Sequence, residues 1–318
     1  MAEILTVTIN PALDVSASTN QVRPAHKLRC QQVQRHPGGG GVNVARVLHR
    51  LGAQVAALYT LGGSTGQMLA ALLDEEGVPG LPVPIAGHTR ESFTVAESSS
   101  AQEYRFVLPG PTLSAPEWQA CLDRVAALQP VPRFVVGSGS LPPGVPDDFY
   151  ARLGQWARAA GARLVVDTSG PALAKALEQG VFLVKPSLRE IRDLTGRTLG
   201  TMGELQHAAQ DWIRAGRAEV VVVSLGEQGA LLVTAGECVF APPLPVTVVS
   251  AVGAGDSFVA GMVWALAAGQ DVVQAFRYGV ACASAALMSS GTGLCAADDV
   301  HRLVAQVQCQ QIVSGYAI

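Results

Sequence analysis

Asp256 follows a run of small residues in the segment VVSAVGAGDSFVAGM, residues 248–262. The pattern predicts an apolar strand followed by an apolar helix, with Gly253, Ala254 and Gly255 where the helix begins. Free amides at a helix N-terminus bind anions, and small residues let a phosphate approach the backbone closely. A carboxylate beside that phosphate can accept the proton of an attacking hydroxyl. The local pattern fits an ordinary N-capping aspartate equally well.

A second glycine-rich segment, HPGGGGVNVAR, covers residues 36–46 and leads into a predicted helix. Four consecutive glycines cost conformational entropy when they become ordered, which favours a functional reason for them. The backbone amides of such a loop and the side chain of Asn43 can hydrogen-bond the hydroxyls of a small polar ligand. The alternative is a flexible loop with a polar first helical turn.

Two further segments carry groups suited to nucleotide phosphates. In KPSLREI, Lys185 follows a buried strand, and Glu190 can bind a magnesium ion through water. Ser187 and Glu190 also have the spacing of a capping box, so a structural role stays open. In VVVSLGEQGALL, residues 221–232, Ser224 is placed to approach a phosphate, although the segment also fits an ordinary hairpin.

GGSTG, residues 62–66, matches the G-x-S-x-G pattern of a hydrolase nucleophile and would make Ser64 the nucleophile. Chance matches are common in a glycine-rich chain, and no HGGG-type oxyanion segment accompanies this one. A serine hydrolase is therefore a minor alternative. The sequence also lacks the motifs of P-loop, Rossmann and zincin proteins.

The segments 13–36 and 88–108 alternate polar and apolar residues and predict half-exposed strands of one small sheet. Such a sheet, projecting from the main domain, would form a lid, and its apolar face would need a cover such as a second subunit. Its charged side chains fit either a solvated face or a phosphate-binding surface. They are Asp14, Lys27, Arg29, Arg90, Glu103 and Arg105.

The remaining chain alternates predicted strands and helices. Valine-rich strands without polar alternation imply a parallel sheet buried on both faces, and short connections predict a doubly wound α/β fold. We expect one domain over residues 1–318, and three helices within residues 256–309. The predicted strands are 4–9, 54–61, 133–138, 162–168, 181–186 and 218–226, and the other predicted helices are 41–52, 65–77 and 147–161.

Composition limits the classes of function. The net charge of −3 with scattered basic residues argues against nucleic-acid binding. The six cysteines form no C-x-x-C pair, so we expect neither a disulfide framework nor a zinc site, and most thiols buried and reduced. No apolar run is long enough to cross a membrane, and the N-terminal segment lacks the basic start of a signal peptide. These features favour a cytoplasmic location.

Taken in order, TINPALD, GGGGVNVAR, SGSLPPG, KPSLRE, VVVSLGEQGA and VGAGDSFVAGM resemble the ribokinase-like (PfkB) sugar kinases over essentially the whole chain. Within that family, KLRC, PGGGGVNVAR and EYRFVLPG are most similar to 6-phosphofructokinases of the isozyme 2 type. This resemblance implies ATP-dependent phosphorylation of fructose 6-phosphate at its 1-hydroxyl, giving fructose 1,6-bisphosphate in glycolysis. It leaves open 1-phosphofructokinase, tagatose-6-phosphate kinase and a non-catalytic binder of sugar or nucleotide.

The resemblance also implies a role for individual residues. Asp256 would be the catalytic base, with Gly253, Ala254 and Gly255 forming the anion hole. The implied sugar and phosphate contacts are Asp14, Lys27, Gly39, Gly40, Asn43, Arg90, Ser92, Arg105 and Ser140. The implied ATP site comprises Lys185, Ser187, Ser224, Gly226 and Gly229, with Glu190 linked to Mg²⁺ through water. Backbone around Ser250, Val252, Ala286, Ser289 and Gly291 would bind a monovalent cation such as K⁺.

Three residues depart from the family pattern. Ser187 and Ser92 replace asparagines and bear on the metal–water network and on sugar specificity, and Gly293 replaces an arginine near the cation loop. The resemblance further implies a homodimer formed through the lid.

Overall fold

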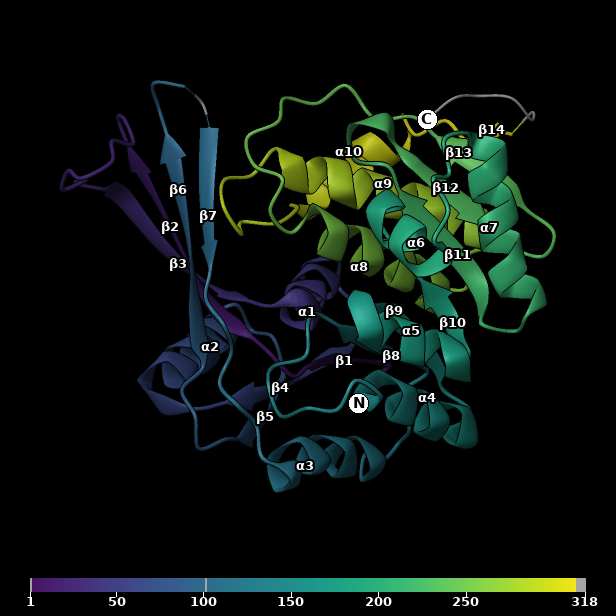
Figure 1. Ribbon diagram of the computed structural model, residues 1–318, viewed down its shortest axis with the longest axis horizontal. Coiled ribbons are helices and arrows are strands. Elements are labelled where there is room, and N and C mark those ends of the chain that lie inside the picture. Colours follow the sequence, from purple (N-terminus) through teal and green to yellow (C-terminus); the bar gives the residue numbers. More distant parts are fainter. Residues whose placement is uncertain (1, 101, 313–318) are drawn as a thin grey trace.

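A computed structural model describes residues 2–100 and 102–312 (Figure 1). Its large sheet has the strand order β14-β13-β12-β11-β10-β9-β8-β1-β4-β5. The strands from β5 to β11 are all parallel, and β12, β13 and β14 extend the sheet in antiparallel fashion. The strands are β1 (Ile4–Thr8), β4 (Val55–Leu61), β5 (Gly80–Pro84), β8 (Phe134–Ser138), β9 (Arg163–Asp167), β10 (Val181–Val184), β11 (Ala218–Ser224), β12 (Ala230–Val233), β13 (Cys238–Ala241) and β14 (Gln310–Gln311).

Helices cover both faces of this sheet, as Figure 1 shows. One face packs against α1 (Gly40–Arg50), α2 (Gly63–Glu75), α8 (Ala254–Ala267), α9 (Val272–Leu287) and α10 (Ala297–Val304). The other packs against α3 (Ala115–Ala126), α4 (Phe149–Ala160), α5 (Gly170–Gln179), α6 (Leu188–Thr195) and α7 (Met202–Arg214).

The central strands are apolar on both faces because each face has its own core. In β11, Val220 and Val222 belong to the core that contains α8 and α9, whereas Val221 and Val223 belong to the core that contains α7. Successive side chains of a strand point to opposite faces, so a doubly covered strand reads as a continuous apolar run. The predicted doubly wound, mostly parallel α/β fold is confirmed.

A second sheet has the order β3-β2-β6-β7 and stands away from the main body in Figure 1. Its strands are β2 (Ala12–Thr19), β3 (Gln31–Gly38), β6 (Arg90–Glu97) and β7 (Gln102–Val107), which we call the small sheet. These strands lie almost entirely within the segments 13–36 and 88–108, of which residue 101 is outside the described residues.

The strand register gives the small sheet two distinct faces. Asp14 pairs with Ser92, which pairs with Val107, and these side chains point toward the main body. The next row of paired residues consists of Val15, Phe93 and Phe106. Because successive side chains of a strand point to opposite faces, the side chains of this row point away from the main body. We call this second side the outer face.

The structure differs from the sequence-based expectations in three places. The predicted strand before Val252 is wrong, because residues 242–251 form no strand and Val248 and Val249 are exposed. Four helices, α3, α5, α6 and α7, were not expected individually. All six cysteines are free thiols, but only Cys121, Cys282 and Cys295 are buried, so the expectation that most are buried is wrong.

Among the described residues, no helix combines the length and the apolar character that crossing a membrane requires.

Candidate active site

A cavity of about 250 Å³ lies at the carboxyl ends of β8 and β9, beneath the small sheet. Ligands of open α/β sheets bind at this edge, since loops from several strands converge there. Groups from both sheets line it. Of the residues predicted from the sequence, the lining includes Asp14, Gly39, Gly40, Asn43, Arg90, Ser92, Arg105, Ser140, Glu190 and Asp256.

Asp256 lies in the first turn of α8 and is not the residue that caps it. The N-cap is Gly253, and the Asp256 carboxylate instead accepts a hydrogen bond from Asn43 Nδ2 at 2.8 Å. Burial and the nearby charge of Asp167 raise the pKa of Asp256 to about 7, although Asn43 and Lys185 oppose the increase. A general base is most effective with a pKa near the working pH, and this carboxylate meets that condition.

The turn before α8 requires a glycine at position 253. Gly253 has a φ of 75°, and a Cβ there would lie 2.4 Å from Leu294 Cδ2. A Cβ on Gly255 would lie 3.4 Å from Lys185 Nζ. Within the described residues, the amides of Gly255 and Asp256 have no acceptor. Together with the positive end of the helix dipole, they can bind an anion.

Lys185 lies directly after β10 and forms an ion pair with Asp167, which ends β9, at 3.1 Å between Nζ and Oδ1. Burial alone would lower the pKa of Lys185, but the charges of Asp167 and Asp256 raise it overall. The lysine is therefore a cation at neutral pH, adjacent to the free amides of α8. Such a pairing of cation and amides suits a phosphate group.

The small sheet contributes two arginines, Arg90 and Arg105, to the cavity lining. Arg90 donates hydrogen bonds to the carbonyls of Leu108 and Asn10. Burial raises the pKa of Asp14, while the charges of Arg105 and Arg90 and a hydrogen bond from Thr292 act to lower it. Arg90, Arg105 and Asp256 therefore line one cavity, and Lys185 lies next to Asp256 and the free amides of α8.

Comparison with known proteins shows the family to which this chain belongs. Residues 6–299 match the model of the pfkB family carbohydrate kinases. The chain belongs to the pfkB family of carbohydrate kinases. The expected family is thus confirmed, and the cavity is the candidate active site of a sugar phosphotransferase.

Several curated relatives of this pfkB kinase are phosphofructokinases. A Mycobacterium tuberculosis protein named ATP-dependent 6-phosphofructokinase isozyme 2 is 49% identical over 299 residues, covering 94% of this chain and 88% of the relative. The Escherichia coli protein of that name is 41% identical over 306 residues, covering 96% and 99%. A 1-phosphofructokinase of Xanthomonas campestris is 38% identical over 268 residues, covering 83% and 84%.

Solved structures of phosphofructokinase-2 from Escherichia coli have the same fold as this pfkB kinase. The complexes with potassium and with fructose-6-phosphate superpose with TM-scores of 0.91 and 0.88, at 41% and 40% identity. A tetrameric inhibited form has a TM-score of 0.90 at 40% identity. Each comparison covers 96% of this chain and 99% of the other.

The residues expected to bind ATP lie along the same sheet edge as the cavity but mostly outside it. Ser224 ends β11, and its amide donates to Pro186, directly after Lys185. Gly226 and Gly229 bound the short 3₁₀ turn that follows. These groups lie at the end of β11, the strand next to β10, which Lys185 follows.

Ser187 and Glu190 form a complete capping box at the start of α6. The Glu190 amide donates to Ser187 Oγ at 3.2 Å, and Glu190 Oε2 accepts from the Ser187 amide at 2.7 Å. The prediction of a capping box is therefore confirmed. Glu190 nevertheless also lines the cavity. Within the described residues, the second oxygen of Glu190 has no hydrogen-bond donor.

The five residues expected around a monovalent cation belong to two segments that backbone hydrogen bonds join. The amides of Val249 and Ser250 donate to the Leu287 carbonyl, which joins the segment before α8 to the end of α9. Ser250 Oγ donates to Glu103 of the small sheet at 3.0 Å, and Ser289 Oγ donates to the Leu294 carbonyl. The full set is Ser250, Val252, Ala286, Ser289 and Gly291.

Two more of the predicted residues, Lys27 and Ser64, fall outside the cavity, and one important residue is missing from the predictions. Lys27 is exposed in the connection between β2 and β3, and Ser64 is exposed on α2. Neither lines the cavity. Asp167 was not predicted, although it contacts Lys185. The only sequence signal was a carboxylate at the end of the apolar strand ARLVVDT.

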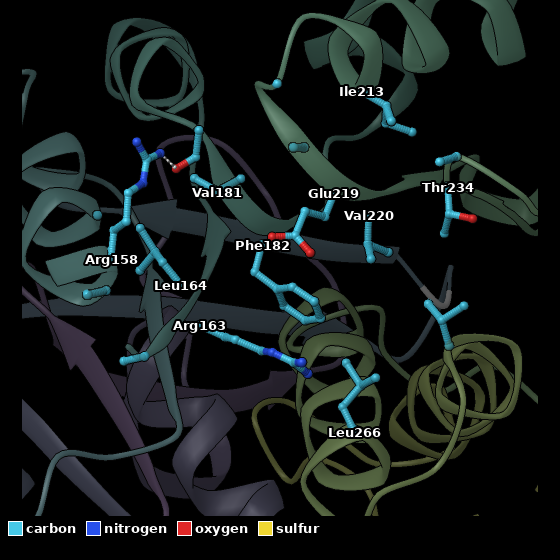
Figure 2. Close-up of a pocket in the computed structure, with 18 of the residues that line it drawn as sticks. Arg158, Arg163, Leu164, Val181, Phe182, Ile213, Glu219, Val220, Thr234 and Leu266 are labelled. Carbon is cyan, nitrogen blue, oxygen red and sulfur yellow. Dashed lines mark hydrogen bonds between the residues drawn. The ribbon is translucent and has the colours of Figure 1, made fainter. Parts of the chain in front are cut away.

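A larger cavity of about 670 Å³ lies at the opposite, amino edge of the sheet (Figure 2). Its walls are mainly apolar, and the Arg163 guanidinium is stacked 4.8 Å from the Phe182 ring centre. It contains no pair of groups comparable to Asp256 and Lys185. Volume alone therefore does not identify the active site of this kinase.

Proposed function

We propose that this pfkB kinase transfers the γ-phosphoryl group of ATP to the 1-hydroxyl of fructose 6-phosphate, giving fructose 1,6-bisphosphate in glycolysis. The observation that carries the proposal is that Asp256, with a pKa raised to about 7, lines the same cavity as Arg90 and Arg105 and lies next to Lys185. The names of the relatives and the fructose-6-phosphate complex of the Escherichia coli protein support this choice of sugar.

In this proposal, Arg90 and Arg105 bind the 6-phosphate, and Asp14 and Asn43 bind sugar hydroxyls. Asp256 accepts the proton of the 1-hydroxyl while the oxygen bonds to the γ-phosphorus and ADP departs. The amides of Gly255 and Asp256 stabilise charge on the transferring phosphoryl group, with Ala254 beside them at the helix start. Such positioning and electrostatic stabilisation account for most of the catalysis of phosphoryl transfer.

The residues present fit a magnesium ion bound with ATP. Magnesium prefers oxygen ligands and retains several waters, so it needs few protein groups. Glu190 offers a free carboxylate oxygen at the cavity, and no cluster of three or more metal-binding side chains occurs among the described residues. When bound, the ion would neutralise phosphate charge.

We extend the proposal to K⁺ at the backbone around Ser250, Val252, Ala286, Ser289 and Gly291. A structure of the Escherichia coli relative contains potassium. The departure from the family pattern at Gly293 removes none of these five residues.

We further propose that the small sheet acts as a lid on the single domain and joins two copies into a homodimer. Its outer face carries Val15, Phe93 and Phe106 in one row, and Phe106 is 56% exposed. Apolar faces of this kind are usually covered by a partner. Use of ATP and of a glycolytic sugar phosphate would place the enzyme in the cytoplasm.

The experiment that tests the proposed reaction is a coupled ADP-release assay over several phosphosugars, with and without K⁺. We expect the highest kcat/KM with fructose 6-phosphate, and a higher rate with K⁺ than without it. Preference for fructose 1-phosphate or tagatose 6-phosphate would favour the alternative kinases. Sugar binding without ADP release would make the protein a non-catalytic binder and overturn the proposal.

A further inference from the structure

Arg46 has a fully buried side chain and does not line the cavity. It lies on α1 one turn after Asn43, the residue that hydrogen-bonds Asp256. A buried guanidinium is costly unless its charge is balanced and its donors are satisfied. The partners of Arg46 therefore indicate what this arginine holds in place.

Glu76, at the C-terminal end of α2, balances the charge of Arg46. The guanidinium binds it in a bidentate way, with Nε 2.9 and 3.0 Å from the two carboxylate oxygens and Nη2 2.6 Å from Oε1. Arg50 shares the same carboxylate at 3.1 Å. Burial would raise the pKa of Glu76, but the hydrogen bonds and charges of Arg46 and Arg50 lower it overall, so the glutamate is ionised.

The remaining nitrogen of Arg46, Nη1, joins two segments that are far apart in the sequence. It donates to the Pro37 carbonyl at 2.9 Å and to the Thr292 carbonyl at 3.1 Å. Pro37 starts the glycine loop, residues 37–40, and Thr292 belongs to the loop between α9 and α10. Arg50 adds a bond to the Gly293 carbonyl at 2.5 Å.

Both segments reach the sugar side of the cavity. Gly39 and Gly40 of the glycine loop line it. The Thr292 side chain lies close enough to Asp14, another lining residue, to act on the pKa of its carboxyl group. Arg46 Nη1 also lies 3.4 Å from Asn43 Oδ1. In contrast, none of the hydrogen bonds of Arg46 involves Lys185 or Ser224 on the ATP side.

We propose that Arg46 is a positioning residue for the sugar, which fixes the glycine loop and the Thr292 loop against each other and so sets the places of Asp14 and Asn43. This inference rests on the proposed function, because it takes this side of the cavity as the sugar side. The bidentate contact with Glu76 fixes the orientation of the Arg46 guanidinium. Arg50 holds the Thr292 loop through its bond to the Gly293 carbonyl.

The test is the kinetics of Arg46→Lys with each substrate varied in turn. Lysine keeps the charge, but a single ammonium cannot replace the planar fork that binds Glu76 and two carbonyls together. We expect the KM for fructose 6-phosphate to rise about tenfold, the effect of one lost charge-assisted hydrogen bond, and the KM for ATP to stay within about twofold. If Arg46 were needed only for folding, the variant would contain less folded protein, and the apparent kcat would fall while both KM values stayed unchanged. That result would overturn the inference.

Two further variants keep the test decisive. Arg50→Gln removes only the partly exposed reinforcement of the Thr292 loop and leaves the contacts of Arg46 in place, so a smaller rise in the same KM is expected even if Arg46→Lys fails to fold. Arg152→Gln breaks an exposed ion pair with Asp148 on α4 and should change neither KM. Equal effects of Arg50→Gln and Arg152→Gln would contradict the inference.

Failure of the proposed function would appear separately, as a wild-type protein that does not phosphorylate fructose 6-phosphate. In that case hydrogen exchange provides the readout. Arg46→Lys should speed amide exchange in residues 38–41 and 290–294 together, whereas unchanged exchange in either segment would overturn the inference.

Discussion

The basicity of Asp256 depends on residues from several parts of the chain. Burial and Asp167 raise its pKa, and Asn43 and Lys185 limit the increase. The sequence placed Asp256 beside small residues, but it could not separate a base from a helix cap, because the capping position depends on the conformation of Gly253. Asp167 could not be assigned either, since its contact with Lys185 arises only when β9 and β10 pair.

The pH dependence of the enzyme should follow Asp256. A base must be ionised to accept a proton, so kcat/KM for fructose 6-phosphate should fall as pH decreases through about 7, the pKa of this carboxylate. Rates measured from pH 5 to 9, at saturating ATP, check this expectation. An acid limb centred near pH 4, the ordinary range of an aspartate, would show that Asp256 is not the titrating base.

At the level of elements, periodicity predicted the central strands and most of the large helices. The strand expected at residues 218–226 is β11 (Ala218–Ser224), and the helix expected at residues 147–161 is α4 (Phe149–Ala160). These elements are apolar on the faces that pack, so the pattern is strong.

Other elements escaped prediction for different reasons. Helix α6 has eight residues and one fully buried side chain, Ile191, and so short a window does not separate a helix from a capped loop. The edge strand β5 contains Pro82 and Pro84, which normally argue against a strand. Arg46 escaped for another reason, because its partners Pro37, Glu76 and Thr292 come from three separate segments.

At the scale of the whole molecule, two sheets must meet to complete the candidate site. The large sheet supplies Lys185 and Asp167, α8 supplies Asp256, and the small sheet supplies the two arginines. Sequence alternation predicted the strands of the small sheet, whereas its register and the direction of each face became clear only from the strand pairing.

The outer face of the small sheet should control assembly. Phe106→Glu places a charge in the apolar row, and we expect it to convert the proposed homodimer into a monomer in light-scattering measurements of molar mass, since burying an unpaired charge is costly. Met68→Glu is the matched control, because Met68 is exposed on α2 in the main body and is 45% exposed. A Phe106→Glu variant with the wild-type molar mass would contradict assembly through this face.

The most direct test of the central claim is turnover by Asp256→Asn. The asparagine can still accept the hydrogen bond from Asn43 and removes a buried charge, so the variant should fold and bind fructose 6-phosphate. Without a base, kcat for ADP release should fall by roughly 10²–10⁴-fold, while the Kd for the sugar, measured by calorimetry, changes little. Near-normal turnover in a folded Asp256→Asn variant would contradict the assignment of Asp256 as the base.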